Sequence, residues 1–294
     1  LSLLIIIPGL VILAIFGAPL SIDFKGGSLL EVSFSEGVSP QPSELIDIYT
    51  NLGYTDQTVQ TTGDNTYIIR SEFIEETQRS QIVSAMEDRF GSPVTILRSD
   101  SVGPTIGREV TSRAGLAVAV AALGVIIYIT FAFRGIAHAF RYGVCAIIAM
   151  LHDALVVLSL AAIGGLLFGW QIDSLFLTAF LTVIGFSVQD KIVVFDRIRE
   201  NSAIYRKLPF EKLANHSIVQ TLQRSINTQL MTSEFMLLAL ALFGGVTLRE
   251  FAVILLVGLL SGTYSSIFIA APLLVLWENQ EWKTWFRSKK PSIA

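Results

Sequence analysis

Several ionisable residues of this chain interrupt long apolar runs, where they could bind and release protons. Asp190 and Lys191 lie in the apolar run 174–195, and His152 with Asp153 stands in the middle of another. A charge at the centre of a membrane costs at least about 2.5–3.5 kcal/mol, so such residues usually face protein or water and mark ion pathways. Proton exchange inside a membrane is the chemistry that these positions favour.

Arg224 is the candidate counter-ion of Asp190. It precedes a later apolar run, and Thr228 shares its helix face at spacing i, i+4, with Asn227 beside them. Because arginine keeps its proton, it would favour the charged carboxylate when near and release it when far. The alternative is an ordinary interfacial arginine that reaches toward the cytoplasm.

The other buried charges allow more than one interpretation. Glu234 lies well inside the fifth apolar run, where an isolated carboxylate would be protonated, so we expect it to pair with Lys191 in a mainly structural ion pair. His152 and Asp153 are either a satisfied polar pair of the helix bundle or a proton relay, since histidine titrates near neutral pH. Asn227 is a further possible relay residue.

Six apolar runs would hold these residues across a bilayer. A spanning helix needs about 20 mostly apolar residues. The composition agrees, since 52% of the 294 residues are hydrophobic and only 15% are charged, against about a quarter charged in soluble domains. The predicted fold is therefore an α-helical membrane protein with six transmembrane helices, over residues 3–20, 114–133, 142–168, 174–195, 226–243 and 250–276.

Lys and Arg in the short connections predict the orientation of these helices. Twelve of them fall on one side, in 134–141, 196–225 and 278–294, whereas the other side carries only Arg249. This bias places both termini in the cytoplasm. The expected organisation is a first helix, an extracytoplasmic domain, five further helices with a cytoplasmic loop at 196–225, and a cytoplasmic tail, over 1–20, 21–112, 113–277 and 278–294.

The polar stretch 21–112 has the pattern of an independent α+β domain. Alternating apolar residues predict strands and helical periodicity predicts helices, in the order β-α-β-β-α-β of ferredoxin-like domains. The segments are 28–34, 43–52, 56–61, 66–70, 75–90 and 94–97. The stretch holds no His, no Cys and no obviously paired acids, so we expect a binding or force-bearing module.

Composition also argues against several classes of function. The net charge of −3 gives no basic surface for nucleic acid, and the single cysteine, Cys145, allows no disulfide framework within the chain. No nucleophile with a neighbouring base, phosphate-binding loop or metal-ligand cluster is evident. We therefore expect no enzyme activity, no cofactor and no metal.

Five segments in order resemble the SecF family of the bacterial Sec protein-translocation machinery. Asp23, Gly26 and Gly27 follow the first apolar run and match the Asp-Phe-x-Gly-Gly signature of that family. The remaining matches are Ser101–Gly107, His152 with Asp153, Val183–Asn201 and Arg224–Thr228. Together they cover nearly the whole chain.

The resemblance implies a function and a set of partners. Such proteins work with a SecD-like six-span subunit, belong to the RND superfamily, and use the proton-motive force to help move unfolded polypeptides from the SecYEG channel across the cytoplasmic (inner) membrane. The proton-coupling residues of the family map onto Asp190, Arg224 and Thr228. Three positions depart from its pattern: Gln189 and Lys191, where an asparagine and a threonine are usual, and Glu234, where small or apolar residues are common.

Two other functions remain open. An RND-type exporter of small molecules or lipids would use two such six-helix halves, but large outside loops are typical of it and the connection at 243–249 is short. A scaffold of the Sec channel that transduces no energy would leave Asp190 without a proton to carry. Replacing Asp190 separates that scaffold from a proton-driven subunit.

Overall fold

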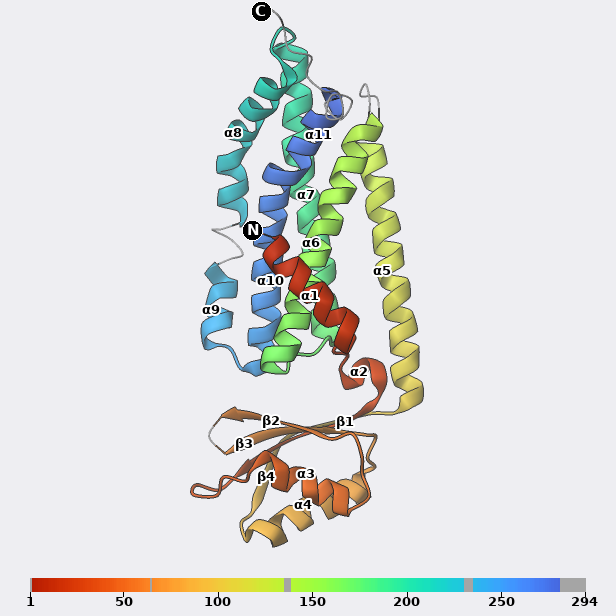
Figure 1. The fold of residues 1–294 in the computed structure, drawn as a ribbon, viewed down its shortest axis with the longest axis vertical. Helices are drawn as coiled ribbons and strands as arrows, with labels where there is room; N and C mark the ends of the chain where they lie inside the picture. The colour runs from red at the N-terminus through yellow and green to blue at the C-terminus, as the bar shows by residue number, and fades with distance from the viewer. Residues whose placement is uncertain (1, 64, 135–138, 230–234, 281–294) are drawn as a thin grey trace, which may run out of the picture. The chain divides into compact units, whose positions relative to one another are not determined.

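The computed structural model describes residues 2–63, 65–134, 139–229 and 235–280 (Figure 1). The chain divides into two compact units. One, the sheet unit, comprises Phe16–Ala117 and Gly164–Leu175. The other, the helical unit, comprises Leu1–Ile15, Val118–Ile163 and Phe176–Ala294.

The sheet unit contains a four-stranded antiparallel sheet with two helices on one face (Figure 1). The strands lie in the order β2-β3-β1-β4. This order and the predicted succession β-α-β-β-α-β together give the split βαβ arrangement. The elements are β1 (Gly27–Phe34), α3 (Pro42–Asn51), β2 (Thr58–Gly63), β3 (Thr66–Ser71), α4 (Glu76–Phe90) and β4 (Val94–Val102).

The core of the sheet unit is apolar, because alternate residues of its strands point to the face that the helices cover. Val32 of β1 and Ile69 of β3 are fully buried, and Leu45 of α3 and Ile82 of α4 pack against them in one cluster. Gly91 ends α4 in the left-handed conformation, with φ 60°. The predicted last strand is longer than expected and extends to Val102.

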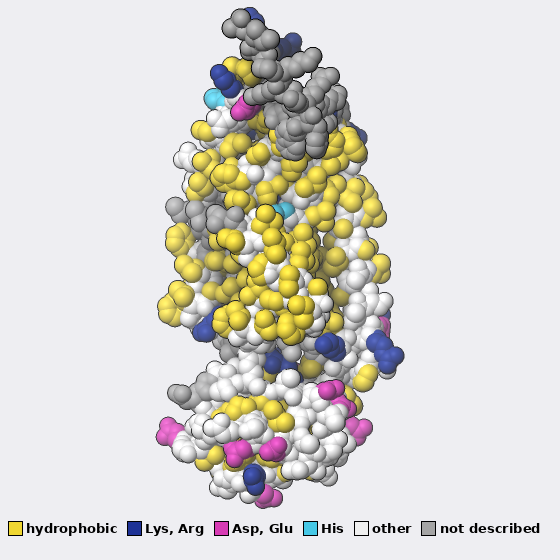
Figure 2. Space-filling view, viewed as in Figure 1, with side chains coloured by type: hydrophobic (Ala, Val, Ile, Leu, Met, Phe, Trp, Pro, Cys, Tyr) yellow, Lys and Arg dark blue, Asp and Glu magenta, His cyan; other side chains and the backbone are white. Residues whose placement is uncertain are grey.

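Among the described residues, four helices are long and apolar enough to cross a membrane. They are α5 (Pro104–Ala132), α6 (Ala139–Phe168), α7 (Ser174–Ile204) and the continuous helix Leu248–Glu278. The last comprises most of α10 (Val246–Ser265), the π-helix η2 (Ser266–Ala270) and α11 (Ala271–Glu278). They correspond to the second, third, fourth and sixth predicted spans. Figure 2 shows hydrophobic side chains gathered over the visible face of the helices.

The first and fifth predicted spans are not established as membrane-crossing helices. The helix α1 (Leu3–Phe16) has 14 residues and ends before the predicted boundary at residue 20. The next residue, Gly17, takes the left-handed conformation with φ 76°. The predicted run 226–243 covers the end of α8 (Phe210–Gln229), residues 230–234 outside the described part, and α9 (Phe235–Phe243). Six spans therefore stay a prediction.

The predicted loop 196–225 is mostly helical. Helix α7 continues to Ile204, supported by i, i+3 ion pairs between Arg197 and Glu200 and between Arg199 and Asp196, each at 2.7 Å. Helix α8 then runs as a single helix into the fifth apolar run. The apolar runs predict only a loop here, because charged residues end an apolar run without ending a helix.

Candidate functional site

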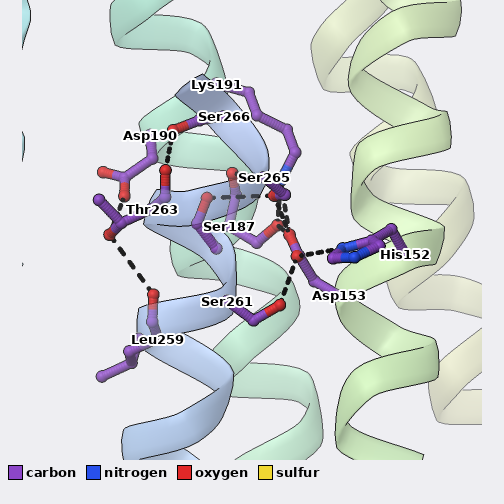
Figure 3. Close-up of polar contacts among 11 residues, drawn as sticks. His152, Asp153, Ser187, Asp190, Lys191, Leu259, Ser261, Thr263, Ser265 and Ser266 are labelled. Carbon is purple, nitrogen blue, oxygen red and sulfur yellow. Dashed lines mark hydrogen bonds and ion pairs between the residues drawn. The ribbon is translucent and has the colours of Figure 1, made fainter. Parts of the chain in front are cut away.

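The carboxylate of Asp153 on α6 is the centre of a buried polar cluster (Figure 3). Asp153 is 1% exposed, and Nζ of Lys191, which is fully buried, lies 2.8 Å from its Oδ2. The hydroxyls of Ser187 and Ser265 each donate to Oδ2 at 2.6 Å, and the hydroxyl of Ser261 donates to Oδ1 at 2.8 Å. We call these five residues the Asp153 cluster.

Helical spacing brings the members of the Asp153 cluster together. Ser187 and Lys191 are i, i+4 on α7, and Ser261 and Ser265 are i, i+4 on α10, so each pair shares one helix face. Gly262 allows the two helices to approach closely, since a Cβ there would lie 3.3 Å from Cα of Ser187. One carboxylate thereby links three apolar helices.

The Asp153 cluster satisfies the hydrogen-bonding needs of its buried charges. Lys191 also donates to the carbonyl of Ser187 at 3.1 Å and to its hydroxyl. A buried ion pair is tolerated where further hydrogen bonds satisfy both charges, whereas removal of one partner leaves a costly unpaired charge. The arrangement therefore neutralises Asp153 and fixes the positions of three helices.

His152 lies at the edge of this cluster. Its Nδ1 is 3.1 Å from Oδ1 of Asp153, and its ring centroid is 6.3 Å from that of Tyr264. Nε2 is buried and has no hydrogen-bond partner among the described residues. The polar-pair interpretation fits Asp153, whose main partner is Lys191. A proton relay through His152 stays a prediction.

Asp190 points to a different helix face from its neighbour Lys191, as the roughly 100° between successive helical residues requires (Figure 3). The residue is 6% exposed, and the hydroxyl of Thr263 on α10 donates to its Oδ2 at 3.1 Å. Asp190 is thus a second buried carboxylate within a long apolar helix, in contact with a neutral hydroxyl. Such a group is suited to proton exchange.

Arg224, Asn227 and Thr228 lie exposed on α8. The hydroxyl of Thr228 donates to the carbonyl of Arg224 at 2.7 Å. Arg224 lines a cavity of about 710 Å³, in which α7 contributes Gln189 and Val193 among others. The cavity therefore adjoins the α7 face beside that of Asp190, and the pairing of Arg224 with Asp190 stays a prediction.

The predicted ion pair between Lys191 and Glu234 involves a residue outside the described part of the chain, Glu234. Among the described residues, the carboxylate of Asp153 lies against Lys191, and a pairing with Glu234 stays a prediction. The sequence suggested Asp153 and Lys191 separately. It could not join them, because they lie 38 residues apart on different helices.

The signature loop has a structural explanation within the sheet unit. A carboxylate oxygen of Asp23 accepts hydrogen bonds from the backbone N–H of Ser174 at 3.0 Å and from its hydroxyl at 2.7 Å, at the N-terminus of α7 where backbone N–H groups lack helical partners. Gly26 and Gly27 take φ 79° and 132°. A Cβ on Gly27 would lie 2.6 Å from the carbonyl oxygen of Ser71. Glycine is therefore required where β1 begins.

Two residues of the site escaped the sequence analysis. Thr263 and Ser265 contact the two buried carboxylates, and Ser187 and Ser261 also donate to Asp153. The sequence does contain a signal for these residues, because two hydroxyl side chains at i, i+4 on an apolar helix share a face and can donate to one buried acceptor. Only the packing of the helices reveals which acceptor that is.

Known proteins are similar to this chain in sequence and in structure. The family model "Protein export membrane protein SecD/SecF, C-terminal" matches residues 82–280, and the "SecD/SecF GG Motif" model matches residues 11–38. A protein translocase subunit SecF of Anaerolinea thermophila is 70% identical over all of this chain and 96% of its own length. A SecF of Synechocystis is 39% identical over 94% of this chain and 87% of its own.

Longer relatives carry the same segment within a larger chain. The protein translocase subunit SecDF of Bacillus subtilis is 33% identical over 94% of this chain, which spans 36% of the SecDF length. A crystal structure of SecDF from Thermus, described as a translocon-associated membrane protein, is 31% identical, with a TM-score of 0.81 over 95% of this chain and 37% of its own.

Proposed function

Because the chain belongs to the SecF family of protein translocase subunits, we propose that it couples the proton-motive force to the movement of polypeptides across the cytoplasmic membrane. Asp190 takes up and releases the coupling proton. Arg224 and Thr228 of α8 tune that carboxylate when the helices move. The resulting motion reaches the sheet unit, which acts on the translocating chain.

The observation that carries this proposal is the burial of Asp190 in an apolar helix. The residue is 6% exposed on α7, and a hydroxyl is its hydrogen-bond donor from α10. The carboxylate of Asp153 is instead held by the ammonium group of Lys191. The direct contact with Lys191 favours the charged form of Asp153, so we assign the exchange of the coupling proton to Asp190.

The partner in this proposal is a SecD-like subunit with its own membrane helices. The SecDF relatives contain a segment similar to this chain within a chain nearly three times as long. The proposed assembly joins this chain to the SecD-like subunit and to the SecYEG channel, with an unfolded polypeptide as the substrate. Exposed apolar surface on α5, of which only 6% of the spanning window is buried, offers area for such a subunit.

The replacement of Asp190 by Asn tests the function directly. Asn keeps the size of the side chain and cannot ionise, so D190N should abolish the acceleration of export by a proton gradient and leave export without a gradient unchanged. Export is measured in membrane vesicles that contain the complete Sec machinery, with and without a protonophore. D196N is the matched control, since Asp196 lies on the same helix, 45% exposed and paired with Arg199.

The two other functions give different results in this experiment. A scaffold that transduces no energy predicts equal gradient dependence in D190N and the parent. A small-molecule or lipid exporter predicts that D190N abolishes transport of such a substrate and leaves protein export unaffected. Either result would reject the coupling function.

The proposed topology has six spans, with both termini in the cytoplasm and the sheet unit outside. It is tested with single cysteines in a chain whose Cys145 is replaced by Ala. A membrane-impermeant maleimide added to intact cells should label S35C, in an exposed turn of the sheet unit, and should spare K207C, between α7 and α8. The reverse labelling would contradict this topology.

A further inference from the structure

A short stretch of α10 contacts both buried carboxylates of the helical unit (Figure 3). Ser261 and Ser265 donate to Asp153, whereas Thr263, two residues from each, donates to Asp190. Two helical steps amount to about 200°, so Thr263 points nearly opposite to the serines. The stretch Ser261–Ser266 therefore lies between Asp153, which pairs with Lys191, and Asp190, which accepts a hydrogen bond from Thr263.

The hydroxyl of Thr263 has two acceptors within reach. Its Oγ1 is 3.1 Å from Oδ2 of Asp190 and 3.4 Å from the carbonyl oxygen of Leu259. A hydroxyl carries one proton and two lone pairs, so it can both donate and accept. It can donate to the ionised carboxylate, or donate to the Leu259 carbonyl while it accepts from the protonated acid.

The backbone around Thr263 is held from both sides. On one side, Ser261 and Ser265 are bonded to Asp153. On the other, the hydroxyl of Ser266 donates to the carbonyl of Thr263 at 2.8 Å, where the π-helix η2 begins. π-helical turns are rare and often occur at functional sites. These contacts fix the height of Thr263 along α10.

We propose that Thr263 is a positioning residue for Asp190, whose hydroxyl bonds both protonation states of the carboxylate and sets the pH at which the proton is exchanged. The inference rests on the proposed function in that Asp190 is the proton carrier. The Asp153 cluster keeps its charges throughout and holds α10 in register. The proton moves only between water and Asp190, and the Thr263 hydroxyl rotates without losing its own.

Other ionisable groups of the helical unit contribute to the same equilibrium, Lys191 through an electrostatic interaction with Asp190. They are Lys191 on α7, His152 and Asp153 on α6, Arg224 on α8 and Tyr264 on α10. A substitution at Thr263 changes none of these charges. A shift in the midpoint pH of Asp190 that depends on the Thr263 hydroxyl is therefore separable from one caused by a change in nearby charges.

The test compares T263V, which removes the hydroxyl at nearly constant volume, with T263S, which restores it. Infrared difference spectra of the purified full chain in lipid vesicles are recorded over a pH titration, and the protonated Asp190 band is assigned by its absence in D190N. Because the hydrogen bond to the ionised carboxylate is stronger than the one from the protonated acid, T263V should move the midpoint about one unit to higher pH, a tenfold change in proton affinity. T263S should return it to the parental value.

T182V is the matched control, because the hydroxyl of Thr182 donates to a backbone carbonyl of its own helix, that of Thr178 at 2.7 Å. It should leave the Asp190 midpoint unchanged. An unchanged midpoint in T263V, a failure of T263S to restore it, or the absence of an Asp190 band over the titrated range would overturn the proposal.

Gradient-driven export separates this inference from the proposed function. If T263V shifts the Asp190 band but D190N exports normally with a gradient, Thr263 positions Asp190 and the coupling function is wrong. If D190N loses the gradient effect while T263V leaves both the band and the pH profile of export unchanged, the coupling function stands and the role of Thr263 is wrong.

Discussion

Both units bury apolar side chains, but among the described residues only the helical unit also buries charged ones. Val32 and Ile69 form the centre of the sheet unit, but Asp153 and Lys191 are equally inaccessible in the helical unit, which leaves Leu123 56% exposed. In water, apolar burial stabilises a fold. Against lipid, apolar side chains gain little from contact with one another, so hydrogen bonds and close packing hold the helices together. The two units are thus adapted to different surroundings.

The largest effect expected from this contrast follows removal of the Lys191 charge. K191M leaves the Asp153 carboxylate buried without its cation, which should destabilise the helical unit by about 3–5 kcal/mol. The double variant D153N/K191M has no buried charge in the pair and should recover at least half of the loss. Unfolding of the full chain in mixed detergent micelles, followed by circular dichroism, measures both.

K212M is the control for this prediction, since Lys212 is exposed on α8. It should fall within about 0.5 kcal/mol of the parent, as surface substitutions usually do. If K191M were equally mild, the charged interior would contribute nothing to stability and the contrast between the units would be lost.

The next effect concerns exposed leucines, whose replacement by aspartate should be costly in the helical unit and mild in the sheet unit. Leu123 on α5 and Leu97 on β4 are 56% and 54% exposed. L123D should disfavour membrane integration by about 3 kcal/mol, the difference between Leu and Asp near the centre of a spanning helix. L97D should change stability by less than about 1 kcal/mol. The fraction of chain that resists carbonate extraction reports on the first, and amide hydrogen exchange on the second.

A smaller effect tests the glycines of the signature loop. G27A places a Cβ against the Ser71 carbonyl at φ 132° and should destabilise the sheet unit by about 1–3 kcal/mol. Hydrogen exchange of β1 and β3 amides measures it, with G103A as the control, because a Cβ on Gly103 meets nothing within 4 Å. Equal protection in both variants would remove the structural explanation of this signature.

The smallest effect is confined to high pH. Burial, with a further contribution from Tyr54, raises the pKa of Tyr49 above its ordinary value of 10.0. The unfolded chain therefore loses the phenol proton above about pH 10 while the folded sheet unit keeps it, so stability is intact below that pH and falls above it. Y49F should abolish this fall in urea titrations at pH 8 and pH 11. A parallel fall in Y49F would assign it to other groups.

The sequence was sufficient for the local features of both units. Alternating and helical periodicities predicted the order of the strands and helices between Gly27 and Val102, and four of the six predicted spans correspond to helices of membrane-crossing length among the described residues. These features depend on neighbours within a few residues. The end of α7 was missed for the same reason, since a change from apolar to charged residues marks the end of an apolar surface and not of a helix.

The site depended on tertiary structure. The sequence by itself determined that Asp153, Asp190 and Lys191 lie within apolar helices, because burial follows from the length of the runs around them. Only the packing of α6, α7 and α10 decided that Lys191 forms an ion pair with Asp153 and that Thr263 donates a hydrogen bond to Asp190. The physical reason is that the partner of a buried charge is set by how helices rotate and approach one another, which glycines and serines distant in the chain determine.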